Sequence, residues 1–220
     1  MLKIKIPKFL IKDGTRIKIQ PKPLEPIEEK ETIKQEIFKK TTEALIDSLK
    51  EPDPFIRAIS AEVLGRMKDK NAVPALINSL KDHSKYVREK AAIALGYIGD
   101  KRAVPALIET LNDENEEVRV TVAGVLGHLK DRLAVPALIK SLKDPSAVTR
   151  MKAAISLGII GDERAVNPLY ECLRDENELV RKYACEALGN IGRKAVPALL
   201  AALKNDKVRA YAAQAMLKIK

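Results

Sequence analysis

Residues 103–133 have the sequence AVPALIETLNDENEEVRVTVAGVLGHLKDRL, and the segments on either side repeat its pattern every 31 residues. Five glycines keep this interval: Gly65, Gly96, Gly127, Gly158 and Gly189. Five arginines keep it as well: Arg57, Arg88, Arg119, Arg150 and Arg181. A fixed period of this size is the signature of a repeat architecture. The sequence therefore predicts a solenoid in which each unit packs only on its neighbours.

Each unit is predicted to contain two helices. Prolines at the same interval (Pro74, Pro105 and Pro136) fall in the first turn of one helix, where a missing N–H costs nothing. A strong N-cap residue type stands four residues before each arginine, at Asp53, Ser84, Asn115, Ser146, Asn177 and Asn205. The side-chain oxygen of such a residue accepts from the free N–H groups of a first helical turn, so the second helix is expected to begin there.

Small residues dominate the second helix, as in the Ala91-Ala92 and Ala153-Ala154 pairs. Small side chains let neighbouring helices approach closely, and the repeated glycine is expected to serve the same purpose. Three further glycines, at Gly99, Gly161 and Gly192, stand where a helix end is predicted.

These columns resemble the HEAT-like repeats of the phycobilisome lyase family, and the resemblance covers residues 41–220. It implies an all-α fold, a right-handed α-solenoid of about six two-helix repeats. It also implies that an aspartate column (Asp82, Asp113, Asp144 and Asp175) and the arginine column form a hydrogen-bonded ladder between units. The alternative is that the arginines bind phosphate or an acidic partner.

The N-terminal part differs from the repeats. Residues 1–25 are predicted to form a basic β-hairpin and a proline-rich linker, and residues 26–40 a capping helix before the array at 41–220. The Asp13-Gly14 pair is a strong turn signal, which pairs Phe9–Lys12 with Thr15–Lys18. The net charge of the chain is +10, and residues 1–20 hold six basic residues against Asp13. One interpretation is that the lysines prevent edge pairing; the alternatives are docking on the first repeat, pairing with another chain, or contact with nucleic acid or anionic lipid.

Neither a membrane-spanning run nor a secretory signal is visible, so a cytoplasmic location is expected. Two cysteines, Cys172 and Cys185, are too few for a disulfide framework. Free thiols are favoured over a local bridge.

Catalytic and metal-binding motifs are also missing from the sequence. It contains no nucleotide-binding glycine motif, no HExxH and no CxxC. The two histidines, His83 and His128, lack the neighbouring acidic residues that bind iron in the related deoxyhypusine hydroxylases. The sequence therefore predicts a non-enzymatic protein without catalytic residues, metal or cofactor.

The variable columns of the second helix are the candidate binding site. At 100° per residue from the arginine, positions +1, +5 and +9 point away from the core. In the middle units these positions hold Glu89 and Gly124 together with the candidate groove residues Ile93, Tyr97, Val120, His128, Met151, Ile155 and Ile159. A rim is expected from Lys90, Lys152, Lys182 and Tyr183.

These positions are expected to line the concave groove formed by the second helices. An exposed apolar patch with a polar rim marks an interaction site, so the predicted function is a scaffold that binds a protein or peptide in this groove. The competing interpretation is that superhelical curvature buries these residues between units. Two other functions stay open: nucleic-acid binding through residues 1–20, and a lyase-like accessory subunit. The sequence does not predict an oligomeric state.

Overall fold

A computed structural model describes residues 9–12, 15–18 and 27–219. The chain divides into two compact units, residues 1–41 and 42–220. In the first unit, strands β1 (Phe9–Lys12) and β2 (Thr15–Lys18) pair antiparallel, with Phe9 opposite Lys18 and Lys12 opposite Thr15. This is the predicted pairing. The Asp13-Gly14 turn and the linker at 19–26 lie outside the described residues.

One helix, α1, covers Ile27–Ser48 without interruption. The sequence separates a capping helix at 26–40 from the array at 41, whereas the structure has a single 22-residue helix across that boundary. The last turns of α1 belong to the second unit, where Leu45 packs against the core. These turns serve as the first helix of the first repeat.

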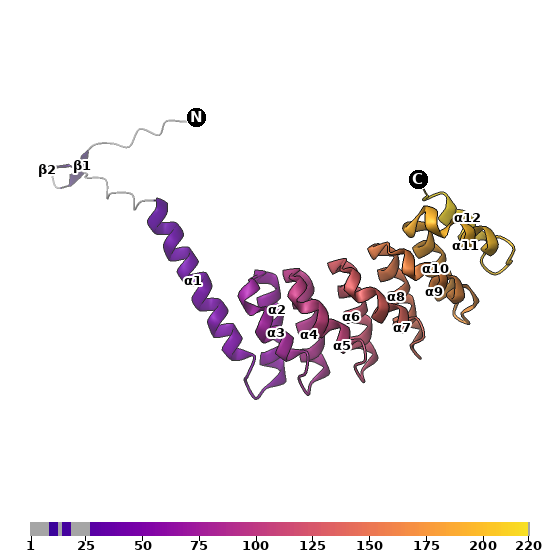
Figure 1. Cartoon of the computed structure of the whole chain (residues 1–220). Helices are drawn as coiled ribbons and strands as arrows, with labels where there is room; N and C mark the ends of the chain where they lie inside the picture. Colours follow the sequence, from indigo (N-terminus) through magenta and orange to yellow (C-terminus); the bar gives the residue numbers. More distant parts are fainter. Residues whose placement is uncertain (1–8, 13–14, 19–26, 220) are drawn as a thin grey trace. The chain divides into compact units, whose positions relative to one another are not determined.

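The second unit consists of six helix pairs, which confirms the predicted solenoid (Figure 1). The end of α1 pairs with α2 (Pro54–Met67). The next pairs are α3 (Val73–Ser79) with α4 (Lys85–Ile98), α5 (Val104–Thr110) with α6 (Glu116–Leu129), and α7 (Val135–Ser141) with α8 (Ala147–Ile160). The last two are α9 (Val166–Glu171) with α10 (Glu178–Ile191), and α11 (Val196–Ala202) with α12 (Arg209–Met216).

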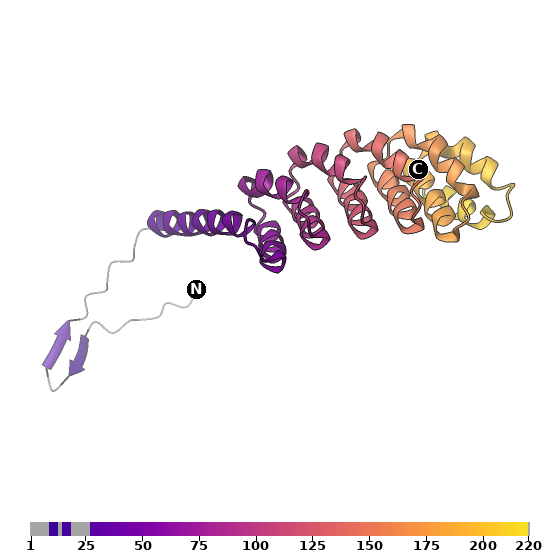
Figure 2. The same ribbon diagram turned by 90° about the horizontal axis from the view of Figure 1, so that it is seen from below.

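The helices of this unit lie in two rows that follow an arc (Figure 2). The second helices α2, α4, α6, α8, α10 and α12 each pack directly on the next one, whereas α3, α5 and α7 make few contacts with one another. The tighter row lies on the inside of a curved array. The second helices therefore form its concave side.

The core runs between the two rows as repeated leucine layers. The first helices α3, α5, α7, α9 and α11 each bury one leucine completely, and the second helices α2, α4, α6, α8 and α10 each bury another. The members are Leu76, Leu107, Leu138, Leu169 and Leu199, and Leu64, Leu95, Leu126, Leu157 and Leu188. Burying such a side chain contributes about 1.5–3 kcal/mol. The leucine layer between the two helices of a unit is therefore the main contribution to the stability of that unit.

The glycine column marks the places where second helices touch. A Cβ on Gly127 would lie 2.5 Å from Ser156 Oγ and 2.9 Å from Ser156 Cα. A Cβ on Gly65 would lie 2.5 Å from Ala94 Cα. The predicted close approach is therefore present, and the column glycine permits it.

The side-chain N-caps predicted for the second helices are present, with two exceptions. Asp53, Asn115, Ser146 and Asn177 cap their helices through the side chain. Ser84 is the N-cap of α4 but makes no such hydrogen bond.

Asn205 is not an N-cap, contrary to the prediction. The link is shortened in the last unit, so Asn205 Oδ1 accepts from the Lys207 N–H, and α12 begins only after Val208.

Gly99 and Gly161 end their helices in the left-handed conformation, with φ of 73° and 71°. Lys68 and Lys130 occupy the same column and adopt the same conformation, with φ of 56° and 51°. A side chain in this region of φ costs energy that glycine avoids. These two helix ends are therefore strained relative to the glycine ends.

Cys172 and Cys185 are free and buried, as the sequence favours. Burial disfavours the thiolate and raises the pKa of Cys172 to about 11 and that of Cys185 to about 12. No helix in the described part of the chain is long and apolar enough to cross a membrane.

Candidate functional site

The seven predicted groove residues all lie on the row of second helices. Ile93 and Tyr97 come from α4, Val120 and His128 from α6, and Met151, Ile155 and Ile159 from α8. None of them is buried: 53% of Tyr97 and 44% of Ile159 is exposed, and Ile93, Val120 and Ile155 are partly exposed. Met151 packs partly against the core. The curvature therefore leaves these side chains accessible, and their role in binding stays a prediction.

The predicted rim residues make specific contacts along this row. Lys90 Nζ lies 2.6 Å from Glu62 Oε2 and so links α4 to α2. Hydrogen bonds from Lys90 and Arg66 lower the pKa of Glu62. The Lys152 stem crosses the Gly124 backbone, since a Cβ on Gly124 would lie 3.4 Å from Lys152 Cδ. Lys182 Nζ lies 5.7 Å from the centre of the Tyr183 ring.

A further apolar column, which is not among the residues predicted from the sequence, lies two residues before each arginine. Its exposed members are Phe55, Tyr86, Val148 and Leu179, and Glu117 interrupts it in the middle unit. At 100° per residue this position falls within the arc of the +1, +5 and +9 columns. The 31-residue interval itself was the signal that would have found it.

We call the surface formed by these columns on α4, α6 and α8 the inner face. Its apolar and aromatic members, with His128, are Tyr86, Ile93, Tyr97, Val120, His128, Val148, Met151, Ile155 and Ile159, and the remaining positions of these columns are Glu89, Glu117 and Gly124. Beside it, between α2 and α4, lies an open depression of about 400 Å³. The lining is mostly apolar, with Phe55, Ile59 and Tyr86, and includes the Lys90–Glu62 ion pair.

The arginine column forms the ladder that the family resemblance implies. Arg119 Nε donates to Asp144 Oδ2 at 2.8 Å and Nη2 to Oδ1 at 3.0 Å, and Nη1 donates to the Asp113 carbonyl. Equivalent rungs join Arg57 to Asp82, Arg88 to Asp113 and Arg150 to Asp175. These guanidinium groups are largely buried and fully engaged, so a phosphate-binding role for this column is not supported.

The Arg57–Asp82 rung shifts the pKa of both of its members. Burial raises the pKa of Asp82, but the hydrogen bonds from Arg57 and the Ser84 N–H outweigh it and the net shift is downward. The hydrogen bond from Asp82 raises the pKa of Arg57. The Arg57–Asp82 rung is therefore an ion pair at neutral pH.

Within residues 27–219 no group of three or more His, Cys, Asp or Glu side chains is placed to hold a metal ion. The basic segment 1–20 lies largely outside the described residues, at 1–8, 13–14 and 19–20. Nucleic-acid binding by that segment stays a prediction.

Comparison with known proteins agrees with this architecture. The chain is similar to the complex of CpcE and CpcF of phycocyanin lyase from Nostoc sp. PCC7120, with 28% identity, 80% of this chain and 75% of that chain covered, and a TM-score of 0.63. It is also similar to a designed armadillo repeat protein in complex with the peptide (KR)4, with 21% identity, coverage of 80% and 98%, and a TM-score of 0.60. An engineered protein matches with 22% identity, coverage of 80% and 95%, and a TM-score of 0.59. The last two likenesses show the fold alone.

No curated protein matches the sequence. Enzymatic relatives exist, since one similar structure is a lyase. The family model of HEAT repeats matches residues 42–115, 104–181 and 168–220. These matches cover every helix pair of the second unit, and the chain therefore belongs to the HEAT repeat family.

Proposed function

We propose that this protein is a scaffold that binds another protein or a peptide on its inner face. The observation that carries the proposal is the exposure of apolar side chains, including Tyr86, Tyr97 and Ile159, on the concave row of second helices. Water contact with these groups is unfavourable, and a partner that covers them gains about 25 cal/mol per Å² of apolar area.

The charges beside the inner face favour a partner with both apolar and acidic groups. Lys152 and Lys182 form no ion pair with any described residue. A carboxylate of the partner that reached Lys152 would lie next to Ile155 and Met151. An amphipathic helix presents such groups together, at intervals of three and four residues. The free thiols of Cys172 and Cys185 fit the reducing, cytoplasmic compartment that the sequence predicts.

A matched pair of variants tests the proposal. Ile155→Glu places a charge in the middle of the inner face, and Leu200→Glu makes a closely similar change on the exposed surface of α11, a first helix. Affinity purification from the native cell, with mass spectrometry before and after nuclease treatment, compares both variants with the wild type. We expect Ile155→Glu to lose partners that Leu200→Glu retains. The proposal fails if both variants, each with an unchanged melting temperature, retain the same partners.

A second candidate function rests on the similarity to the CpcE–CpcF complex. In this interpretation the protein is an accessory subunit of a lyase-like enzyme. The subunit would then co-purify with a second repeat protein and with a bilin-type chromophore or its carrier protein. Visible absorbance of the purified complex measures the chromophore, and a colourless preparation without a carrier protein contradicts this candidate.

A further inference from the structure

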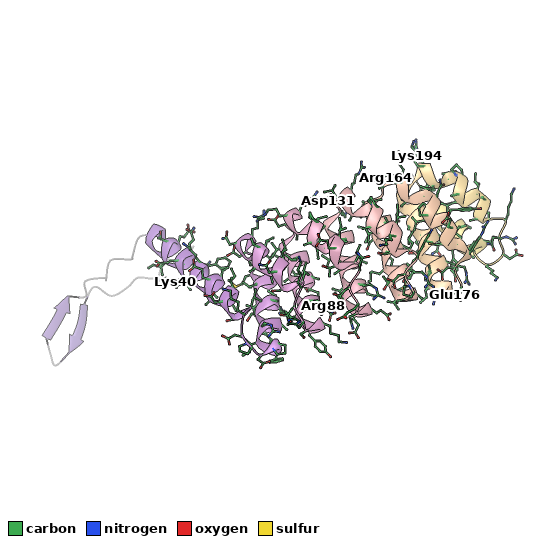
Figure 3. The ribbon with its side chains drawn as sticks, turned by 60° about the horizontal axis from the view of Figure 1, so that its bottom comes forward. Lys40, Arg88, Asp131, Arg164, Glu176 and Lys194 are labelled. Carbon is green, nitrogen blue, oxygen red and sulfur yellow. The ribbon has the colours of Figure 1, made fainter. Side chains whose placement is uncertain are left out.

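The turns that join one repeat to the next form a basic edge on the second unit. We define the basic edge as residues 68–70, 99–102, 130–132, 161–164 and 192–194. It contains nine basic and five acidic residues, a net charge of +4. All nine basic residues are exposed. Figure 3 shows Asp131, Arg164 and Lys194 along this edge, with Arg88 and Glu176 along the opposite one.

The acidic groups of the basic edge are mostly turned into the protein. Asp100 Oδ1 accepts from the Arg102 N–H, and Asp162 Oδ1 accepts from the Arg164 N–H, so each aspartate caps a 3-10 turn. Only 12% of the Asp100 side chain and 8% of the Asp162 side chain is exposed. The surface that solvent meets is therefore more cationic than the residue count indicates.

Two arginines of the basic edge are held in fixed positions across the junctions between units. Arg102 Nη2 donates to the Lys70 carbonyl at 3.2 Å, and Arg164 Nη2 donates to the Arg132 carbonyl at 3.1 Å. Each is also paired with the aspartate two residues before it. About half or more of each side chain remains exposed. The two arginines lie two units apart in one column, whose other members are Asn71, Leu133 and Lys194, and each of the five turns holds at least one cation. Because both arginines are already anchored, little of their side-chain entropy remains to be lost on binding.

We propose that the basic edge binds the sugar–phosphate backbone of a nucleic acid without regard to sequence. A regular row of cations on a rigid array suits a polymer with regularly spaced negative charges. Guanidinium groups bind phosphate with matching geometry. Four helix-to-helix steps of roughly 8–10 Å give the row a length that is on the order of ten base pairs.

The apolar content of the basic edge argues against a protein partner. Leu133, next to it, is the one large apolar side chain that is exposed in these turns, all of which are described. Protein interfaces contain an apolar centre, and base-stacking sites contain aromatic side chains. The basic edge has neither, so contact with the phosphate backbone is the mode that its chemistry favours. This surface is separate from the inner face and does not depend on the proposed scaffold function.

A pair of triple variants of the full chain tests this proposal. The first carries Lys101→Gln, Arg132→Gln and Lys194→Gln, which are exposed and hold only long ion pairs of 3.4–3.8 Å. The control carries Lys81→Gln, Lys143→Gln and Lys204→Gln, exposed lysines on the opposite edge. Both lose three positive charges and keep residues 1–20, so the difference between them isolates the basic edge.

The probe is a fluorescein-labelled 20-base-pair DNA duplex, titrated by fluorescence anisotropy at several salt concentrations between 50 and 200 mM. We expect the first variant to bind at least tenfold more weakly than the control at 100 mM salt. Its slope of log affinity against log salt is expected to shrink by about 3, one for each lost phosphate contact. Ile155→Glu is expected to bind the duplex normally.

Three results overturn the proposal. Equal losses in the two triple variants assign binding to overall charge or to residues 1–20. Displacement of the duplex by polyglutamate at matched charge concentration assigns the basic edge to an acidic protein. Failure of the wild type to bind at 50 mM salt removes nucleic acid as a ligand.

Discussion

Arg150 and Asp175 form a bidentate ion pair across a repeat boundary, with Nε 2.8 Å from Oδ2 and Nη2 2.9 Å from Oδ1. Arg181 occupies the same column one unit later, but Asn205 stands in the aspartate position of the last unit. Arg181 Nε is buried and has no hydrogen-bond partner among the described residues. A buried donor without a partner costs about 1–3 kcal/mol.

Asn205→Asp is therefore expected to complete a fifth rung and to stabilise the C-terminal repeat. A charged partner for Arg181 should raise the free energy of unfolding by about 1 kcal/mol, less than the full cost because the new carboxylate must also be desolvated. Urea denaturation measures the change. Asn205→Asp in an Arg181→Met background is the control and should give no gain; an equal gain there would show that the rung is not the cause.

Gly127 is predicted to tolerate no side chain. A Cβ at this position would approach Ser156 at both its side chain and its Cα, so the backbones of α6 and α8 must separate. Gly127→Ala should lower the free energy of unfolding by about 2 kcal/mol. Gly124→Ala on the same helix is the control, because its new Cβ meets only the flexible Lys152 stem at 3.4 Å. This control should stabilise the protein by about 0.5–1 kcal/mol through helix propensity. The two variants should move the midpoint of thermal unfolding in opposite directions.

Lys130→Gly is predicted to be stabilising. Lys130 ends α6 at a φ of 51°, where glycine carries no steric cost. Relief of this strain should exceed the added entropy of the unfolded chain, with a net gain of about 0.5–1 kcal/mol. Gly99→Ala, the reverse change in the same column, should lose a similar amount. Unfolding in guanidinium chloride distinguishes these outcomes, and a loss of stability in Lys130→Gly would refute the strain argument.

Acid is predicted to weaken the junctions between repeats. The hydrogen bond from the Arg102 side chain lowers the pKa of Asp100 from 3.8 to about 2, and Arg164 does the same for Asp162. A carboxylate whose pKa is lower in the folded state contributes stability above about pH 4, and this contribution is lost as the pH falls towards 2. The free energy of unfolding should therefore fall over this window. The double variant Asp100→Asn and Asp162→Asn should start less stable at pH 5 and show a shallower decline; the same slope in both proteins would contradict the assignment.

The sequence predicted the repeated parts of the molecule and missed what depends on exact spacing. Most positions that recur at 31 residues have similar environments, so the close contact at Gly127 could be predicted from the glycine column, whereas the Arg119–Asp144 rung was implied by the family resemblance. The shortened link before Arg209 breaks that rule, which is why Asn205 does not cap α12. The helical period also predicts the direction in which a side chain points. It does not predict the exposed fraction of that side chain, which depends on how far neighbouring repeats lie from each other. Tyr97 and Met151 share the predicted face, yet only Met151 packs against the core.

The rungs of the ladder give the array a simple way to change its length. Each unit presents an aspartate to the unit before it and an arginine to the unit after it, and the middle units do so with nearly identical contacts. A tandem duplication of 31 codons within this region would therefore insert a helix pair whose two sides already match their new neighbours. The gene of such a protein gains or loses binding surface in whole steps, without having to evolve a new interface each time.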